Sequence, residues 1–337
     1  MSNRWPGGLI RKTPVTPTGP FQNGAASGVW SLADASYWLK QGLWPIAGNI
    51  PTGTFAIFAL GFTTVRVTTR DKYTYSGCAV SAGTAATTAS SEGSAAGNST
   101  VGIFALGFTT VRVTTRDKYT YSGCVVSAGT AATAASNVGS AAGNSTVGIF
   151  ALGIVACASS TTRNKYTYSG DVVSTGGVAT CASRQGSAAG SSTVGIFALG
   201  FTFASVTTRD KYTYSSCVVS AGTAATAASR TGSAAGNGTF GIFALGLASC
   251  ARSTTRNKYT YSGDVVSAGT AATTASNTGS AAGNSTVGIF ALGNTGVRVT
   301  TRDKYTYSGC VVTAGGAATT ASSCGSAASN GTTGVNI

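Results

Sequence analysis

One phrase recurs along the chain and limits what the chain can fold into. The segment GIFALG begins at Gly102, Gly148, Gly195, Gly241 and Gly288, and a degenerate copy begins at Ala56. The step between copies is 46 or 47 residues, and the phrase KYTYS recurs six times at the same step. A fixed period of this length is the signature of a repeat architecture, in which each copy is one supersecondary unit. We therefore expect six equivalent units that form one repeat domain.

Composition separates a short N-terminal segment from the repeats. All six prolines and all four tryptophans lie within residues 1–51, so we predict two parts, 1–51 and 52–337. Residues 1–29 hold four of the prolines and predict an extended arm. The segment Ser31–Lys40 predicts one short amphipathic helix, with Gly42 and Pro45 as stop signals. Docking on the repeats or on another protein would cover its apolar stripe.

Each repeat predicts four β-strands. The first is the small-residue piece Gly139–Gly143, and an Asn-Ser turn leads into the second, Val147–Gly153. The second strand is apolar on both faces, which predicts burial between stacked sheets. The third strand, Val111–Ser122, places Arg and Lys on one face and tyrosines on the other. After a Ser-Gly turn the fourth strand follows, around Cys124–Ala128.

Six four-stranded units of this period predict an all-β fold, a six-bladed β-propeller. The repeats begin at a second strand (54–61) and end with a spare first strand (Gly325–Ser329), which could complete the first blade and close the ring. The segment Gly334–Ile337, the opening of a seventh copy, is not explained by this closure. An open solenoid is the alternative.

The order of strands resembles the kelch repeat. It departs from the usual kelch pattern because Leu106-Gly107 supplies one glycine instead of two, and Val125 stands near the place of the kelch tryptophan. The wording Asp117–Ser122 with Ala141–Val147 resembles repeats of bacteriophage virion proteins, especially fibre-like ones.

The segments Ala26–Leu32 and Leu43–Pro45 likewise resemble the N-terminal attachment segment of phage tail fibres. This resemblance implies a virion location and attachment to other virion proteins through the arm. The residues expected to make that attachment are Trp30, Leu32, Trp38, Leu39 and Trp44.

An Arg-Asp/Asn-Lys triplet in every repeat is the sharpest polar feature. In a closed ring the triplets would form a belt of positive charge that suits an anionic glycan of a host surface. The alternative is a solvated strand whose Asp holds neighbouring backbone. Asparagine at 164 and 257 argues against an essential acid at that site. The candidate ligand-binding residues are Arg70, Lys72, Arg116, Lys118, Arg163, Lys165, Arg209, Lys211, Arg256, Lys258, Arg302 and Lys304. The tyrosines beside them could stack on sugars, but packing between blades is the preferred interpretation.

Cysteine positions alternate between repeats. Four repeats carry a Cys after the Ser-Gly turn, whereas repeats three and five carry Asp171 and Asp264 there and gain Cys157 and Cys250 in the preceding connection. Cys124 to Cys157 and Cys217 to Cys250 are both 33 residues apart. This pattern predicts disulfides Cys124–Cys157 and Cys217–Cys250, with free thiols as the alternative.

The chain is basic, with a net charge of +14, no histidine and a single glutamate, Glu92. These facts remove most acid–base and metal chemistry, so we expect no enzyme activity, no cofactor and no metal site. Dispersed charges argue against nucleic acid, and no apolar run is long enough to insert into a membrane. We expect a virion protein that adheres to a host surface and forms a homo-oligomer. A purely structural decoration or connector subunit is the alternative.

Overall fold

The computed structural model describes residues 4–5, 8–9, 37 and 53–331. The chain divides into two units, Met1–Ile50 and Pro51–Ile337. In the first unit, β1 (Arg4–Trp5) pairs antiparallel with β2 (Gly8–Leu9). Tyr37 apart, the expected helix Ser31–Lys40 lies outside the described residues, as do the five expected attachment residues and the segment Gly334–Ile337.

The second unit is all-β and contains six four-stranded antiparallel sheets. The first three, in spatial strand order, are β32 (Ser326–Ser329), β3 (Phe55–Ala59), β4 (Arg70–Thr74) and β5 (Ala79–Gly83); β6 (Ser94–Gly97), β7 (Val101–Ala105), β8 (Arg116–Thr120) and β9 (Val125–Gly129); and β11 (Ser140–Gly143), β12 (Val147–Ala151), β15 (Arg163–Thr167) and β16 (Val172–Thr175). The other three are β17 (Ser187–Gly190), β18 (Val194–Ala198), β19 (Arg209–Thr213) and β20 (Val218–Gly222); β22 (Ser233–Gly236), β23 (Phe240–Ala244), β26 (Arg256–Thr260) and β27 (Val265–Gly269); and β28 (Ser280–Gly283), β29 (Val287–Ala291), β30 (Arg302–Thr306) and β31 (Val311–Ala314).

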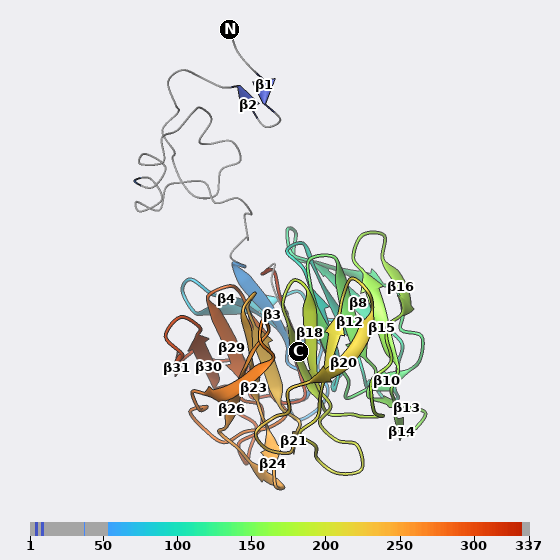
Figure 1. Cartoon of the computed structure of the whole chain (residues 1–337), viewed down its shortest axis with the longest axis vertical. Coiled ribbons are helices and arrows are strands. Elements are labelled where there is room, and N and C mark those ends of the chain that lie inside the picture. The colour runs from blue at the N-terminus through green and yellow to red at the C-terminus, as the bar shows by residue number, and fades with distance from the viewer. Residues whose placement is uncertain (1–3, 6–7, 10–36, 38–52, 332–337) are drawn as a thin grey trace. The chain divides into compact units, whose positions relative to one another are not determined.

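The last strand completes the first sheet. β32 pairs with β3 in the register Ala56↔Ser329 to Ala59↔Ser326, although 267 residues separate Ala59 from Ser326. The first strands contact one another in a cyclic order, β32, β6, β11, β17, β22, β28 and again β32. Figure 1 shows β3 and β4, near the start of the unit, beside β29 and β30, near its end. The arrangement is a β-propeller-like fold.

Small residues allow the first strands to approach so closely. Five of them have the sequence SAAG and the sixth SAAS, and all of their residues are buried. An Asx turn ends most of them: the side chain of Asn98, for example, accepts the N–H groups of Thr100 and Val101 at 2.9 Å each. The turn reverses the chain into the second strand, as expected.

The hydrophobic core lies between neighbouring sheets, in six separate clusters. Because side chains alternate along a strand, Ile103 of β7 packs against the sheet of β12, and Phe104 packs against the sheet of β3. Tyr119 and Tyr121 are buried in the same cluster as Phe104. The predictions of a second strand covered on both faces and of packed tyrosines are confirmed.

The third strand is shorter than predicted, Arg116–Thr120 instead of Val111–Ser122. Residues 111–115 belong to a connection that folds back on itself through isolated bridges such as Phe108↔Arg112. In the two 47-residue repeats the extra residue creates small hairpins. These are β13 (Ile154–Val155) with β14 (Ala158–Ser159), and β24 (Leu247–Ala248) with β25 (Ala251–Arg252); β10 (Ser136–Asn137) and β21 (Ser229–Arg230) join them as third strands.

Candidate binding face

The triplet arginines were predicted to form an exposed belt, and this prediction is wrong. The alternative was a solvated strand whose Asp holds neighbouring backbone; the strand is not solvated, but the Asp does accept backbone N–H groups. Each triplet arginine is at most 1% exposed, because neighbouring sheets cover both faces of the third strand. Arg70 donates from Nη2 to the carboxylate of Asp117 in the next sheet at 2.8 Å, and its guanidinium lies 4.6 Å from the centroid of the Phe104 ring. The arginines in this position are Arg70, Arg116, Arg163, Arg209, Arg256 and Arg302. They connect sheets and are not available to an external ligand.

The middle residue of each triplet, Asp or Asn, accepts a hydrogen bond from the triplet arginine of the preceding sheet. Asp117 also accepts the backbone N–H of Thr87 at 3.0 Å and its hydroxyl at 2.6 Å. Asn164 keeps the same arrangement: its Oδ1 accepts the N–H of Thr133 at 3.0 Å and Nη2 of Arg116 at 3.1 Å. The position therefore serves the contact between sheets, and an amide can replace the carboxylate geometrically but not in charge.

The triplet lysines are half-buried, and each points at the residue after the turn that follows the third strand of the next sheet, which is Ser-Gly in five repeats and Ser-Ser before Cys217. Where that residue is Asp, an ion pair forms, as from Lys118 to Asp171 at 2.7 Å. Burial alone would raise the pKa of Asp171, but hydrogen bonds from Lys118 and Tyr166 and the charge of Lys118 outweigh it and lower the pKa. Where that residue is Cys, Nζ lies 3.6–3.9 Å from the sulfur. The lysines therefore also connect sheets.

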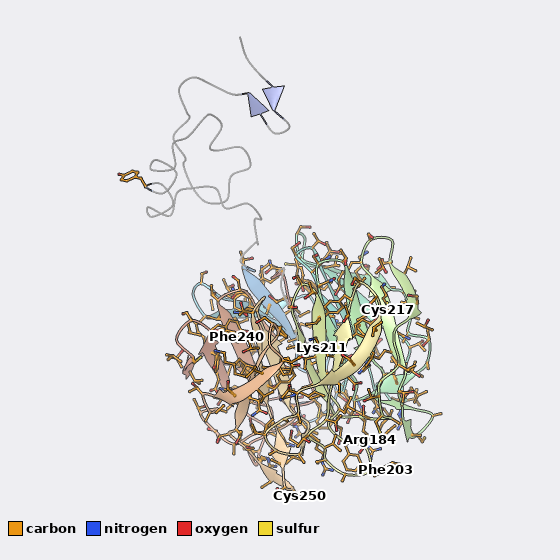
Figure 2. The ribbon with its side chains drawn as sticks, in the orientation of Figure 1. Arg184, Phe203, Lys211, Cys217, Phe240 and Cys250 are labelled. Atoms are coloured by element: carbon orange, nitrogen blue, oxygen red, sulfur yellow. The ribbon has the colours of Figure 1, made fainter. Side chains whose placement is uncertain are left out.

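The two predicted disulfides, Cys124–Cys157 and Cys217–Cys250, are absent, and all eight cysteines are free. Cys124 lies in the turn after the third strand of its repeat, β8, whereas Cys157 lies in the connection before the third strand of the next repeat, β15. The two cysteines therefore lie at opposite ends of these five-residue strands. Figure 2 shows Cys217 in the upper half of the second unit, Pro51–Ile337, and Cys250 at the lower end of that unit. Bonded cysteines need Cα atoms within about 7 Å. The alternation of Cys and Asp instead reflects the contact with the triplet lysine.

Sequence divergence among the six copies is concentrated in one structural place. The third strands have the sequence RDKYT or RNKYT, yet the connections between second and third strands differ: FTTVRV twice, IVACASS, FTFASV, LASCARS and NTGVRV. The pair before each first strand differs as well, from Ser91-Glu92 to Arg184-Gln185. We call the loops 60–69, 106–115, 152–162, 199–208, 245–255 and 292–301 the connection loops. Ser91 and Phe108 exchange two backbone hydrogen bonds of 2.9 Å, so the pairs and the loops lie at the same end.

A ring of backbone hydrogen bonds lies at this end. The N–H of Val138 donates to the carbonyl of Glu92 at 2.9 Å, and the N–H of Glu92 donates to that of Cys324 at 2.8 Å. The remaining links are Gln185 to Val138, Thr231 to Gln185, Thr278 to Thr231 and Cys324 to Thr278, all 2.8–2.9 Å. All six residues have φ between 48° and 58°. Because the six hydrogen bonds return to their starting residue, the sheets surround a common axis. The six residues of this ring carry acid, amide, hydroxyl, thiol or apolar side chains.

Six arginines lie at the same end, around that ring. They are Arg66, Arg112, Arg184, Arg230, Arg252 and Arg298. Unlike the triplet arginines, these are half-buried or exposed, and none makes an ion pair within residues 53–331. The carboxylate at this end is that of Glu92, which accepts the side-chain amide of Asn137 at 2.6 Å. We call these six arginines with the connection loops the arginine face.

Aromatic and amide side chains hold several of these guanidinium groups. Arg66 lies 4.4 Å from the centroid of the Phe108 ring, and Arg184 lies 4.5 Å from that of Phe201. Arg252 donates to Asn277 and Asn294 at 3.1 and 3.0 Å. Stacking restricts the side chain but leaves N–H edges that can bind an anion.

Exposed apolar side chains of the connection loops also belong to the arginine face. Phe203 is 97% exposed in the middle of its connection loop, and Val65, Val111 and Val297 are also exposed. Figure 2 shows Phe203 and Arg184 near one another in the lower part of the unit, and Cys250 in the lower part as well. The sequence reasoning missed this face, although the difference between repeat copies was a signal that could have found it.

Within the described residues, no group of three His, Cys, Asp or Glu side chains is placed to hold a metal ion. The described part of the chain also contains no helix of sufficient length and hydropathy to cross a bilayer.

The chain was compared with known proteins, and neither a family model nor a curated protein matches it.

Proposed function

We propose that this chain is a non-enzymatic bacteriophage virion protein, similar to a tail fibre, whose six-bladed kelch-like propeller adheres to the host surface. In this proposal the first 51 residues attach it to other virion proteins, and several copies act together as a homo-oligomer. The arginine face, in place of the triplet belt, contacts an anionic glycan. Repeated weak contacts on many copies would raise the total affinity.

One observation carries the proposal. The copies agree where side chains hold sheets together and differ in the connection loops and in the pairs before the first strands. These two places hold the six arginines of the arginine face, which no carboxylate of residues 53–331 neutralises. A structural repeat needs no such divergence at one end. Exposed guanidinium groups beside apolar side chains suit sulfate, phosphate or carboxylate groups on a sugar chain.

The direct test measures binding of the purified protein to dextran sulfate, with neutral dextran of equal length as the ligand control. We expect binding to dextran sulfate alone, and we expect it to weaken with salt. The variant pair Arg252→Gln with Arg298→Gln should weaken binding by about a hundredfold or more, because charge-assisted hydrogen bonds contribute about 1.5–3 kcal/mol each.

The matched control is Lys72→Gln with Lys304→Gln, which removes the same charge from the boundaries between sheets. This pair should bind as the unmodified protein does. Equal losses from both pairs would show attraction by net charge alone, and unchanged binding in the arginine pair would refute the proposed face.

The exposed apolar side chains favour a second candidate, a decoration or connector subunit that binds another virion protein. Phe203 and Val297 offer apolar area of the kind that protein interfaces bury. If Phe203→Ser abolishes incorporation into the particle and host-cell binding is unaffected by the arginine pair, the connector is the better description.

A further inference from the structure

The buried guanidinium groups between the sheets are neutralised at four of the six boundaries. There an ion pair of 2.7–2.8 Å joins arginine to aspartate; the pairs are Arg70–Asp117, Arg163–Asp210, Arg256–Asp303 and Arg302–Asp71. At the other two boundaries, the amides of Asn164 and Asn257 accept Arg116 and Arg209 at 3.1 and 3.2 Å. An amide oxygen brings no net charge. Within residues 53–331, Arg116 and Arg209 therefore have no anionic partner.

Both groups remain cations at neutral pH despite their burial. Desolvation lowers the pKa of Arg116 and of Arg209 to about 10, which is still far above 7. The ring of Phe150 lies 4.6 Å from the Arg116 guanidinium, and that of Phe243 lies at the same distance from Arg209. The arginines at the four aspartate boundaries have equivalent aromatic neighbours, so these rings do not replace the missing carboxylate.

A small cavity adjoins each of the two arginines. Arg116 lines one with Ser94 and Ser136, and Arg209 lines another with Ser187 and Ser229. Each cavity measures about 10 Å³, which is the space that accommodates one water-sized particle. Nε of Arg116 is buried without a hydrogen-bond partner, and so are Nε and Nη1 of Arg209. Unpaired donor groups, a small cavity and an excess positive charge therefore occur at the same two arginines.

We propose that a small monovalent anion, chloride or a similar halide, binds at these two boundaries. It balances the charge of Arg116 and Arg209 and accepts their unpaired N–H groups. The cavity is too small for tetrahedral sulfate or phosphate. Cavities of the same size adjoin Arg70, Arg163 and Arg302, but there the protein supplies the carboxylate, so the halide does not bind.

The two sites should differ in strength. Glu92 lines the cavity beside Arg116, whereas Gln185 takes the equivalent place beside Arg209. A carboxylate repels an anion and an amide does not. We therefore expect tighter binding at Arg209.

Bromide, which scatters X-rays anomalously, tests the location directly. Crystals of the full chain in sodium bromide should show anomalous peaks beside Arg116 and Arg209, with higher occupancy at Arg209. Peaks of equal height at all six boundaries, or none at these two, would overturn the proposal.

Urea unfolding at constant ionic strength tests the same sites in solution, with sodium gluconate replacing sodium chloride. Above saturation, each tenfold rise in chloride should lower the unfolding constant about a hundredfold for two sites. The pair Asn164→Asp with Asn257→Asp should remove this dependence, and Asp117→Asn should raise it to about a thousandfold by adding a third site. A chloride dependence that survives the aspartate pair would refute the assignment. This proposal does not rest on glycan adhesion.

Discussion

Removing one buried carboxylate tests the contact between sheets most sharply. Asp117 accepts three hydrogen bonds from the preceding sheet, from Nη2 of Arg70 and from the N–H and hydroxyl of Thr87. Asp117→Ala leaves a buried cation and a buried backbone donor without an acceptor. Asp117→Asn can keep three hydrogen bonds, as Asn164 does in the natural chain, where Oδ1 accepts two of them and Nδ2 donates the third to the hydroxyl of Thr133.

The two substitutions should therefore differ in cost. Breaking a buried ion pair by removing one partner costs about 3–5 kcal/mol, which we expect for Asp117→Ala. Hydrogen bonds to charged groups contribute about 1.5–3 kcal/mol and neutral ones about 0.5–1.5, so Asp117→Asn should cost about 1–2 kcal/mol.

Urea unfolding followed by circular dichroism measures both, in gluconate buffer so that halide binding does not offset the loss. Asp171→Ala is the control, because its ion pair with Lys118 is partly exposed and should contribute at most about 1 kcal/mol. If Asp117→Ala costs no more than Asp171→Ala, the buried ion pairs do not hold the sheets together and the reasoning fails.

Three further predictions follow from the fold. A chain that ends after Cys324 lacks β32 and exposes the edge of β3, so size-exclusion chromatography should show aggregation, whereas a chain that ends after Gly331 should elute as a folded species; a folded shorter chain would contradict ring closure. Burial raises the pKa of the strand tyrosines, that of Tyr305 to about 12, so the stability they contribute is complete below the unfolded pKa near 10 and is lost as pH rises through the folded values. Absorbance at 295 nm should therefore show ionisation together with unfolding well above pH 10, and early ionisation in a folded protein would speak against this burial. Peptide mapping without reduction should return Cys124 and Cys157 as separate free thiols, and a linked peptide would disprove the placement of their turns.

The strands were largely predictable because their signals are local. The apolar pattern of Val147–Ala151 and the Asn-Ser turn before it determine strand, turn and burial within a few residues of each other. The third strand was predicted too long, since Val111–Thr115 alternates like a strand although it folds back as part of a connection loop. Alternation reports which side chains share a face but not whether the face meets another strand.

The buried arginines show why the candidate site could not be predicted in the same way. Arg116 and Asp117 are neighbours in the chain, yet Arg116 faces the following sheet and Asp117 the preceding one. Their partners are 47 or 48 residues away, at equivalent positions of other repeats. A charged residue on a strand indicates solvent unless the neighbour that covers it is known.

The sequence alone determined the period and the four-stranded unit, because each depends on patterns within one repeat. It supplied a spare first strand at its end, and the tertiary structure decided that this strand closes the ring and does not leave an open solenoid. Only the tertiary structure decided which charges connect sheets and which meet solvent. Identical sheets stacked around an axis bury both faces of the third strand. The positive charge therefore reaches the surface on the arginine face, in the connection loops and the pairs before the first strands, where neighbouring sheets do not cover the chain completely.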